Sequence, residues 1–236
     1  MPLLGEIIHE SLGKVRVTVR RNSRQATARW KNGLVNLNIP APAPLPTLNR
    51  ILNELAPRLL ACRPTLRYTE GQLLSFPGVE IRITTQRVAP TTILATPSLP
   101  VGAIEVGCEI DMNTDATTRA ISGLLCRMAR RIAPELLLPR ARQLAESINR
   151  YPLGWKISTG HRILGTCNAN GIIRLSYVLV FLPQELRDYV ILHELAHLSE
   201  MNHSPRFHAL LDGYLGGREQ QLTAALRTYL WPVLRH

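Results

Sequence analysis

The segment HELAHLSEMNH, residues 193–203, contains three of the seven histidines of the chain and two glutamates. His193 and His197 are four residues apart, so on a helix they share a face and could bind one divalent metal ion. Glu194 would lie beside such an ion, where a carboxylate can take a proton from water. This H-E-x-x-H spacing is typical of metal-assisted hydrolysis. The alternative is a buried histidine pair that bonds to backbone groups.

A catalytic zinc site normally has three protein ligands and one open position, so a third ligand is expected. Glu200 is an unfavourable choice, because on a continuous helix it would lie about 10 Å beyond His193 along the axis. His203 can reach back if the chain turns before it, and Ser204 and Pro205 are typical of a new helix start. Otherwise His203 is a surface residue at that helix start. The predicted site has three metal ligands and one general base: His193, His197, His203 and Glu194.

Three imidazoles suit Zn²⁺, which we predict as the cofactor, although Mn²⁺, Co²⁺ and Ni²⁺ are alternatives for such a ligand set. A purely structural metal that holds the helix to the following turn is the other interpretation. A carboxylate beside an open coordination position would have no use at a structural site, so the presence of Glu194 favours the catalytic interpretation.

The elements that must position these residues lie in the second half of the chain. From Asn113, cap-type residues precede leucines and alanines at helical spacing, and a second helix is expected from Pro134 to Asn149. Two strands joined by the turn NANG are expected next, in residues 155–167 and in GIIRLSYVLVF, residues 171–181. The helix with the H-E-x-x-H segment follows them.

The first half contains several segments with the alternation of strands. The pair Asn32-Gly33 between two of them predicts a β-hairpin. A helix is expected around Thr47 to Ala61, bent or interrupted near Pro57. No internal repeat is visible in the sequence.

These elements predict an α+β fold. A strand-rich N-terminal region would occupy residues 1–112, and a catalytic half with helices, a strand pair and the H-E-x-x-H helix would occupy residues 113–236. A chain of 236 residues can bury a sizeable core in this arrangement.

The charge balance is strongly basic, with 28 Lys and Arg against 17 Asp and Glu and a net charge of +11. The segment Lys14 to Lys31 holds seven basic residues and no acidic one. This predicts a basic N-terminal hairpin that could bind nucleic acid. The alternative is a strand whose arginines simply face solvent, since no aromatic residues alternate with them as a base-stacking surface requires.

Nothing in the sequence indicates a membrane or secreted protein. The longest apolar run, YVLVFLP, is too short to cross a bilayer, and the start MPLLGEIIHE has glutamates where a signal peptide would have lysines. The four scattered cysteines form no C-x-x-C pair, which argues against a zinc ribbon or a disulfide framework. A cytoplasmic protein is therefore expected.

The string LGTCNANGIIRLSYVLVFLPQELRDYVILHELAHLSEMNHSPRF, residues 164–207, resembles the YgjP-like metallopeptidases. These are a zincin family related to the SprT-like proteases. The order of its motifs is kept: a W-G-S-C-like strand, an I-x-L-N-like strand, a Pro-initiated helix with Y-V-x-x-H-E-L-x-H-L, and N-H-S-x-x-F. The chain departs from the family pattern at four positions outside the predicted ligands and base: Leu164, Thr166, Ser176 and His208.

The resemblance implies a zinc-dependent peptidase that acts on peptides or proteins, with the three histidines as ligands and Glu194 as general base. An edge strand of a zincin usually pairs with an extended substrate, and residues 171–177 are the expected strand here. Tyr177, Tyr214 and Arg206 are candidates for stabilising the oxyanion, although each has a structural alternative.

Overall fold

The computed structural model describes residues 3–21, 23–31, 34–61, 66–85 and 88–234. The chain divides into two compact units, residues 1–66 with 234–236 and residues 67–233, which are described separately. The predicted α+β class is confirmed, since the described residues form three sheets and five α-helices.

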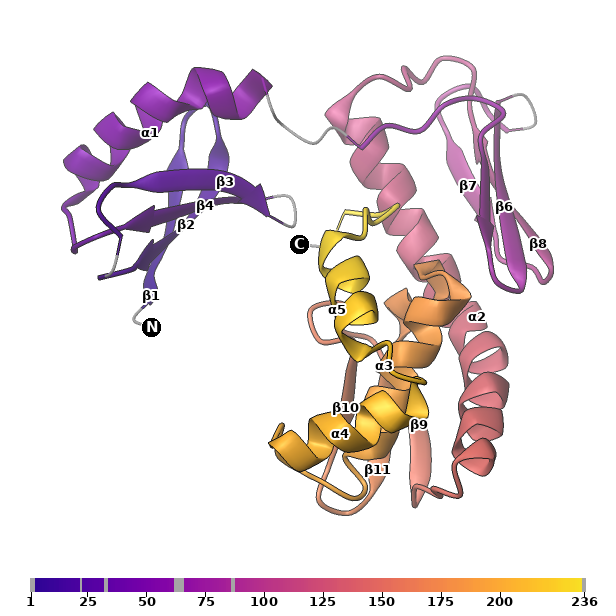
Figure 1. Ribbon diagram of the computed structural model, residues 1–236. Helices are drawn as coiled ribbons and strands as arrows, with labels where there is room; N and C mark the ends of the chain where they lie inside the picture. Colours follow the sequence, from indigo (N-terminus) through magenta and orange to yellow (C-terminus); the bar gives the residue numbers. More distant parts are fainter. Residues whose placement is uncertain (1–2, 22, 32–33, 62–65, 86–87, 235–236) are drawn as a thin grey trace. The chain divides into compact units, whose positions relative to one another are not determined.

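The first unit is a four-stranded sheet with one helix, shown in indigo and purple in Figure 1. The strand order is β1-β2-β4-β3, in which β2 and β4 are parallel and the outer pairs are antiparallel. The elements are β1 (Leu3–His9), β2 (Gly13–Val19), β3 (Thr27–Lys31), β4 (Leu34–Ile39) and α1 (Leu45–Ala61).

Alternation along β2 gives this sheet one apolar face. Val15, Val17 and Val19 are buried in a core with residues of α1, whereas Lys14 and Arg16 lie on the opposite face. The hairpin predicted around Asn32-Gly33 is confirmed by the antiparallel pairing of β3 with β4, although that turn lies outside the described residues. The basic segment Lys14 to Lys31 is not itself a hairpin, because its strands β2 and β3 lie on opposite sides of β4. The predicted helix is also present, and it continues through its internal proline.

The second unit begins with a sheet of the same topology. Its order is β5-β6-β8-β7, again with a parallel central pair and antiparallel outer pairs. A helix follows the fourth strand, as in the first unit, so the two ββββα modules repeat one topology that the sequence does not reveal. The elements are β5 (Leu73–Phe76), β6 (Val79–Thr85), β7 (Ile93–Thr96), β8 (Val101–Val106) and α2 (Asp115–Ser147).

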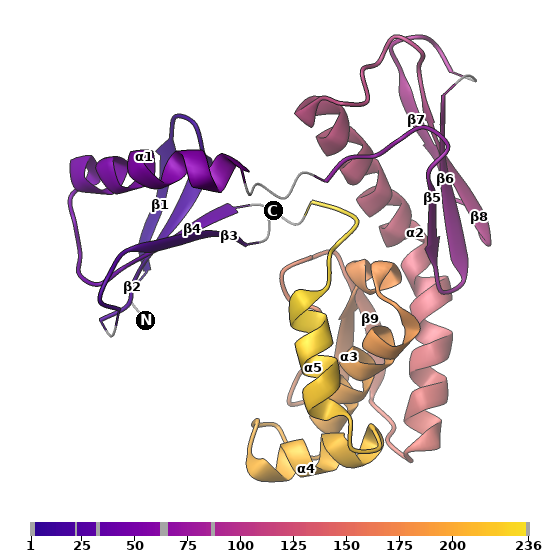
Figure 2. The same ribbon diagram turned by 45° about the horizontal axis from the view of Figure 1, so that its top comes forward.

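Helix α2 is one continuous helix of 33 residues, where the sequence predicts two helices. Thr114 caps its start by accepting a hydrogen bond from the backbone N–H of Thr117. Pro134 and Pro139 remove backbone donors inside it without ending it. The helix is buried at intervals along its whole length, and packing of this kind outweighs local propensity. Figure 2 shows how far it extends beyond the β5–β8 sheet.

The remaining elements of this unit surround the predicted site. The sheet order is β10-β11-β9, with β11 antiparallel to β10 and parallel to β9. The predicted strand over residues 155–167 is thus two separate strands on opposite sides of β11. The predicted strand over residues 171–181 ends at Ser176, which caps the 3₁₀ helix that follows. The elements are β9 (Gly154–Ser158), β10 (Gly165–Cys167), β11 (Ile172–Ser176), the 3₁₀ helix η1 (Tyr177–Phe181), α3 (Gln184–Ala196), α4 (Pro205–Tyr214) and α5 (Glu219–Thr228).

The boundary between the compact units, at residues 66–67, differs from the predicted division at residues 112–113. The reason is α2, which packs on β7 and also on η1, α3 and β9. The second sheet therefore belongs to the same unit as the H-E-x-x-H helix. That residues 113–236 form the catalytic region stays a prediction.

Candidate metal centre

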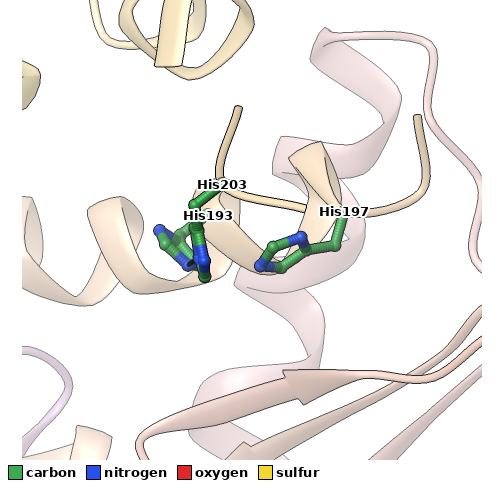
Figure 3. A group of neighbouring side chains, drawn as sticks. All are labelled: His193, His197 and His203. Atoms are coloured by element: carbon green, nitrogen blue, oxygen red, sulfur yellow. Dashed lines mark hydrogen bonds between the residues drawn. The ribbon is translucent and has the colours of Figure 1, made fainter. Parts of the chain in front are cut away.

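Three histidines meet where α3 ends and the chain turns. His193 lies in the last turn of α3, and His197 is the residue that caps its C-terminus. The turn brings the chain back, and Ser204 starts α4 by accepting a hydrogen bond from the backbone N–H of Phe207. His203, just before this cap, thereby faces the other two imidazoles (Figure 3).

The distances within the cluster are short. The three potential ligand nitrogens lie within 4.8 Å of one another, and Nε2 of His193 is 3.0 Å from Nε2 of His203. Two nitrogens that each lie 2.0–2.1 Å from one tetrahedral zinc are about 3.3 Å apart. The donor set therefore fits a single divalent ion that takes nitrogen ligands.

Neighbouring groups hold two of the rings in place. Nδ1 of His197 donates a hydrogen bond to the backbone carbonyl of Glu200 at 3.0 Å, which leaves Nε2 to face the cluster. The fully buried ring of Phe207 stacks on His197 with a centroid distance of 4.5 Å. It also lies 4.9 Å from the ring of His193 and 4.8 Å from that of His203. Phe207 is thus an apolar support for all three imidazoles.

Burial keeps His193 and His197 neutral. Burial lowers the pKa of His193 to about 4, with smaller contributions from the neighbouring imidazoles. Burial also lowers the pKa of His197, partly offset by its hydrogen bond to the carbonyl of Glu200. The neutral imidazole is the form that binds a metal ion.

Glu194 lies on the buried side of α3 and is only 5% exposed. Burial raises the pKa of its carboxyl group to about 7, which leaves it able both to accept and to release a proton near neutral pH. The carboxyl group lies against Gly165 of β10. The structure therefore places the predicted base beside the edge strand next to α3.

The structure corrects the expected strand for substrate pairing. Residues 171–177 contain β11, which is the middle strand of its sheet and is already paired on both sides. The edge strand that contacts α3 is β10. The sequence could not show this, because one apparent strand before β11 is two strands in the fold.

The structure gives two of the three candidate oxyanion residues other hydrogen-bond partners. The hydroxyl of Tyr177 accepts a hydrogen bond from Arg130 at 3.4 Å, and the hydroxyl of Tyr214 accepts one from Arg150 at 3.2 Å. Arg206 is an exposed residue in the first turn of α4.

A fourth histidine lies near the cluster. Nδ1 of His208 is 2.6 Å from a carboxylate oxygen of Glu219, and its ring centroid is 6.3 Å from that of His203. The sequence predicts no specific role for His208, because its partner lies on a different helix, eleven residues further along the chain.

In the described part of the chain, no helix combines the length and apolar character needed to cross a membrane. No curated protein and no solved structure matches the chain significantly. The sequence model of the YgjP-like metallopeptidase domain matches residues 24–228, which include both the H-E-x-x-H segment and most of the first ββββα module. The chain therefore belongs to the YgjP-like metallopeptidase family.

Proposed function

We propose that the protein is a zinc-dependent peptidase in which Glu194 is the general base. The metal ligands in this proposal are His193, His197 and His203. The convergence of three imidazoles where α3 ends, with the buried carboxyl group of Glu194 on the same helix, is the observation that carries the proposal. The family match supports a metal cofactor and a peptide or protein substrate.

Zinc bound by the three imidazoles would polarise the scissile carbonyl and lower the pKa of water, towards about 7. Glu194 takes the proton that water loses as it attacks, and then delivers this proton to the leaving amine. Its burial suits both steps, because the raised pKa reduces the cost of protonating the carboxylate. Nδ1 of His197, bonded to the carbonyl of Glu200, keeps that ring oriented.

The unpaired edge of β10 is the proposed binding place for the substrate backbone. Among the described strands, β10 pairs only with β11, so its outer N–H and C=O groups are free to pair with an extended peptide. Recognition would then depend mainly on backbone hydrogen bonds. A peptide N-methylated at residues flanking the scissile bond should be cleaved much more slowly than its parent peptide. Equal cleavage of both peptides would contradict pairing at β10.

The direct test compares Glu194→Gln with Glu200→Gln for zinc content and for cleavage of a casein-derived peptide mixture. Glu194→Gln should retain zinc and lower cleavage by about 10²–10⁴-fold, the usual contribution of a general base. Glu200→Gln is the matched control, because the contact of Glu200 with His197 uses a backbone carbonyl. If Glu194→Gln cleaved as fast as the unchanged protein, a structural metal site would be the better interpretation.

A second candidate function is binding of nucleic acid by the first unit. Four exposed arginines in and near its β2–β3 connection support this proposal: Arg20, Arg21, Arg24 and Arg29. Phosphate contacts would make the affinity fall steeply with salt. We expect a fluorescent duplex to bind at low salt and the triple Ala variant of the first three arginines to bind more weakly. Absence of binding at low salt would reject this candidate.

We also propose that the protein acts in the cytoplasm. Cys108, Cys126 and Cys167 are free thiols, which agrees with a reducing compartment. Fractionation of cells that produce the protein would test the location.

A further inference from the structure

Gly165, the first residue of β10, lies so close to the predicted base, Glu194, that no side chain would fit between them. A Cβ atom built on Gly165 would lie 2.5 Å from Cγ, 2.6 Å from Oε1 and 2.7 Å from Cδ of Glu194. Real Cβ atoms essentially never approach other heavy atoms this closely. The carboxyl group of Glu194 therefore occupies the space that a side chain at position 165 would need.

The backbone does not explain a glycine at this position. Gly165 is absent from the residues with positive φ, so an L-residue could adopt its conformation. It is also regularly paired with Leu175 of β11. The requirement for glycine is thus steric and comes from a single side chain on another element.

The neighbouring positions show which face of β10 is involved. Gly165 and Cys167 are two residues apart and so lie on the same face of the strand. Their partners in β11 are the fully buried Leu175 and Ile173. The charge of Glu194 also contributes to raising the pKa of Cys167, after the larger effect of burial. The inner face of β10 therefore lies over Glu194, and the missing side chain of Gly165 provides the space for its carboxyl group.

We propose that Gly165 is a positioning residue, which lets the Glu194 carboxyl group lie between β10 and α3, the helix that ends at His193 and His197. A larger residue displaces this carboxyl group, because the end of a side chain moves more easily than a paired strand. The three atoms nearest to the added Cβ atom all belong to Glu194 and none to a histidine. This inference rests on the proposed role of Glu194 as general base.

The first measurement compares Gly165→Ala with Gly154→Ala. Gly154 is the matched control, since it begins β9 of the same sheet and a Cβ atom there meets nothing within 4 Å. Gly165→Ala should bind zinc as the unchanged protein does, with kcat lowered by about 100-fold, the cost of a misplacement of about 1 Å. KM should change little. A kcat within twofold of that of Gly154→Ala would overturn the proposal.

A second measurement separates this proposal from the proposed function. The added methyl group should lower the Tm of Gly165→Ala by about 2–4 °C, which corresponds to roughly 1 kcal/mol in a protein of this size. The decrease should vanish in a Glu194→Ala background, where the obstructing side chain is absent. A decrease of equal size in both backgrounds would overturn the steric contact. If the contact is verified but the unchanged protein and Glu194→Gln cleave no peptide, the proposed function fails and the positioning by Gly165 remains.

Discussion

The two ββββα modules have the same strand order and pairing, yet only one is joined to the candidate metal centre in its own compact unit. The first module ends with α1, a helix of 17 residues that completes the core of its own sheet. The second ends with α2, a helix of 33 residues that packs on β7 and continues past η1, α3 and β9. Because α2 is longer than α1, the second module also supports the elements around the candidate metal centre.

The difference is also visible in how each helix is buried. The buried residues of α1 belong to a core shared with the strands of its own sheet. Those of α2 extend from Thr117 to Ala145, beyond the part that covers the β5–β8 sheet. The helices of the two modules therefore have different roles: α1 stabilises its own sheet, and α2 also stabilises the surroundings of α3.

The largest effect is expected at the metal centre in the second unit. His203→Ala removes one of the three proposed nitrogen ligands, so the variant should lose its zinc on dialysis and its peptidase activity with it. Elemental analysis of the dialysed protein measures this. His161→Ala, outside the cluster, is the control and should keep about one zinc per chain. Retention of zinc by His203→Ala would remove His203 from the site.

A matched pair of core substitutions tests the comparison of the two helices. Leu52 in α1 and Leu125 in α2 are both fully buried, so either Leu→Ala change should cost about 2–5 kcal/mol of unfolding free energy in its own unit. Leu125→Ala should lower the temperature at which peptidase activity is lost by roughly 5–15 °C.

Leu52→Ala should leave that inactivation temperature unchanged, because the described residues of the metal centre lie in the other unit. Far-ultraviolet circular dichroism should still detect the weakened first unit. Equal loss of activity on heating in both variants would show that the site depends on both modules to the same degree.

A smaller effect is expected at Arg187, which fastens the second module to α3. This buried guanidinium donates hydrogen bonds to the carbonyls of Pro77, Leu179 and Val180. Arg187→Met leaves these carbonyls, of which those of Leu179 and Val180 belong to buried residues, without their donor, and the unfolding free energy should fall by about 1.5–3 kcal/mol.

Urea unfolding followed by circular dichroism measures the effect of Arg187→Met. Arg218→Met is the control, since Arg218 forms a surface ion pair with Glu185 that should contribute under about 1 kcal/mol. Equal midpoints for the two variants would contradict a fastening role for Arg187.

Local sequence patterns predicted the structure correctly where residues close together along the chain determine it. The alternation in KVRVTV favours a strand with one face towards solvent, and Val15, Val17 and Val19 on the other face of β2 are buried. Ser204 and Pro205 predict the helix start that lets His203 return, and α4 begins there. In both cases the signal spans only a few residues, within the range of a strand period or a helix cap.

The patterns failed where packing between distant segments decides. Pro134 predicts a break, yet α2 continues because its buried residues pack on several other elements. The segment before β11 reads as one strand, yet β9 and β10 pair on opposite sides of β11. The repeat of the ββββα topology is not visible in the sequence. Two strands with the same place in the fold need only a similar alternation of apolar and polar residues, not the same residues.

The sequence by itself determined the chemistry proposed for this protein: two histidines and a glutamate at helical spacing, a turn that returns a third histidine, and the family to which the motifs belong. Only the tertiary structure decided what surrounds that chemistry. It identified β10 as the edge strand beside α3 and the carboxyl group of Glu194 as the neighbour of Gly165. The reason is physical: ligand spacing is set by a helical turn of the backbone, whereas burial and steric fit depend on segments that meet only after folding.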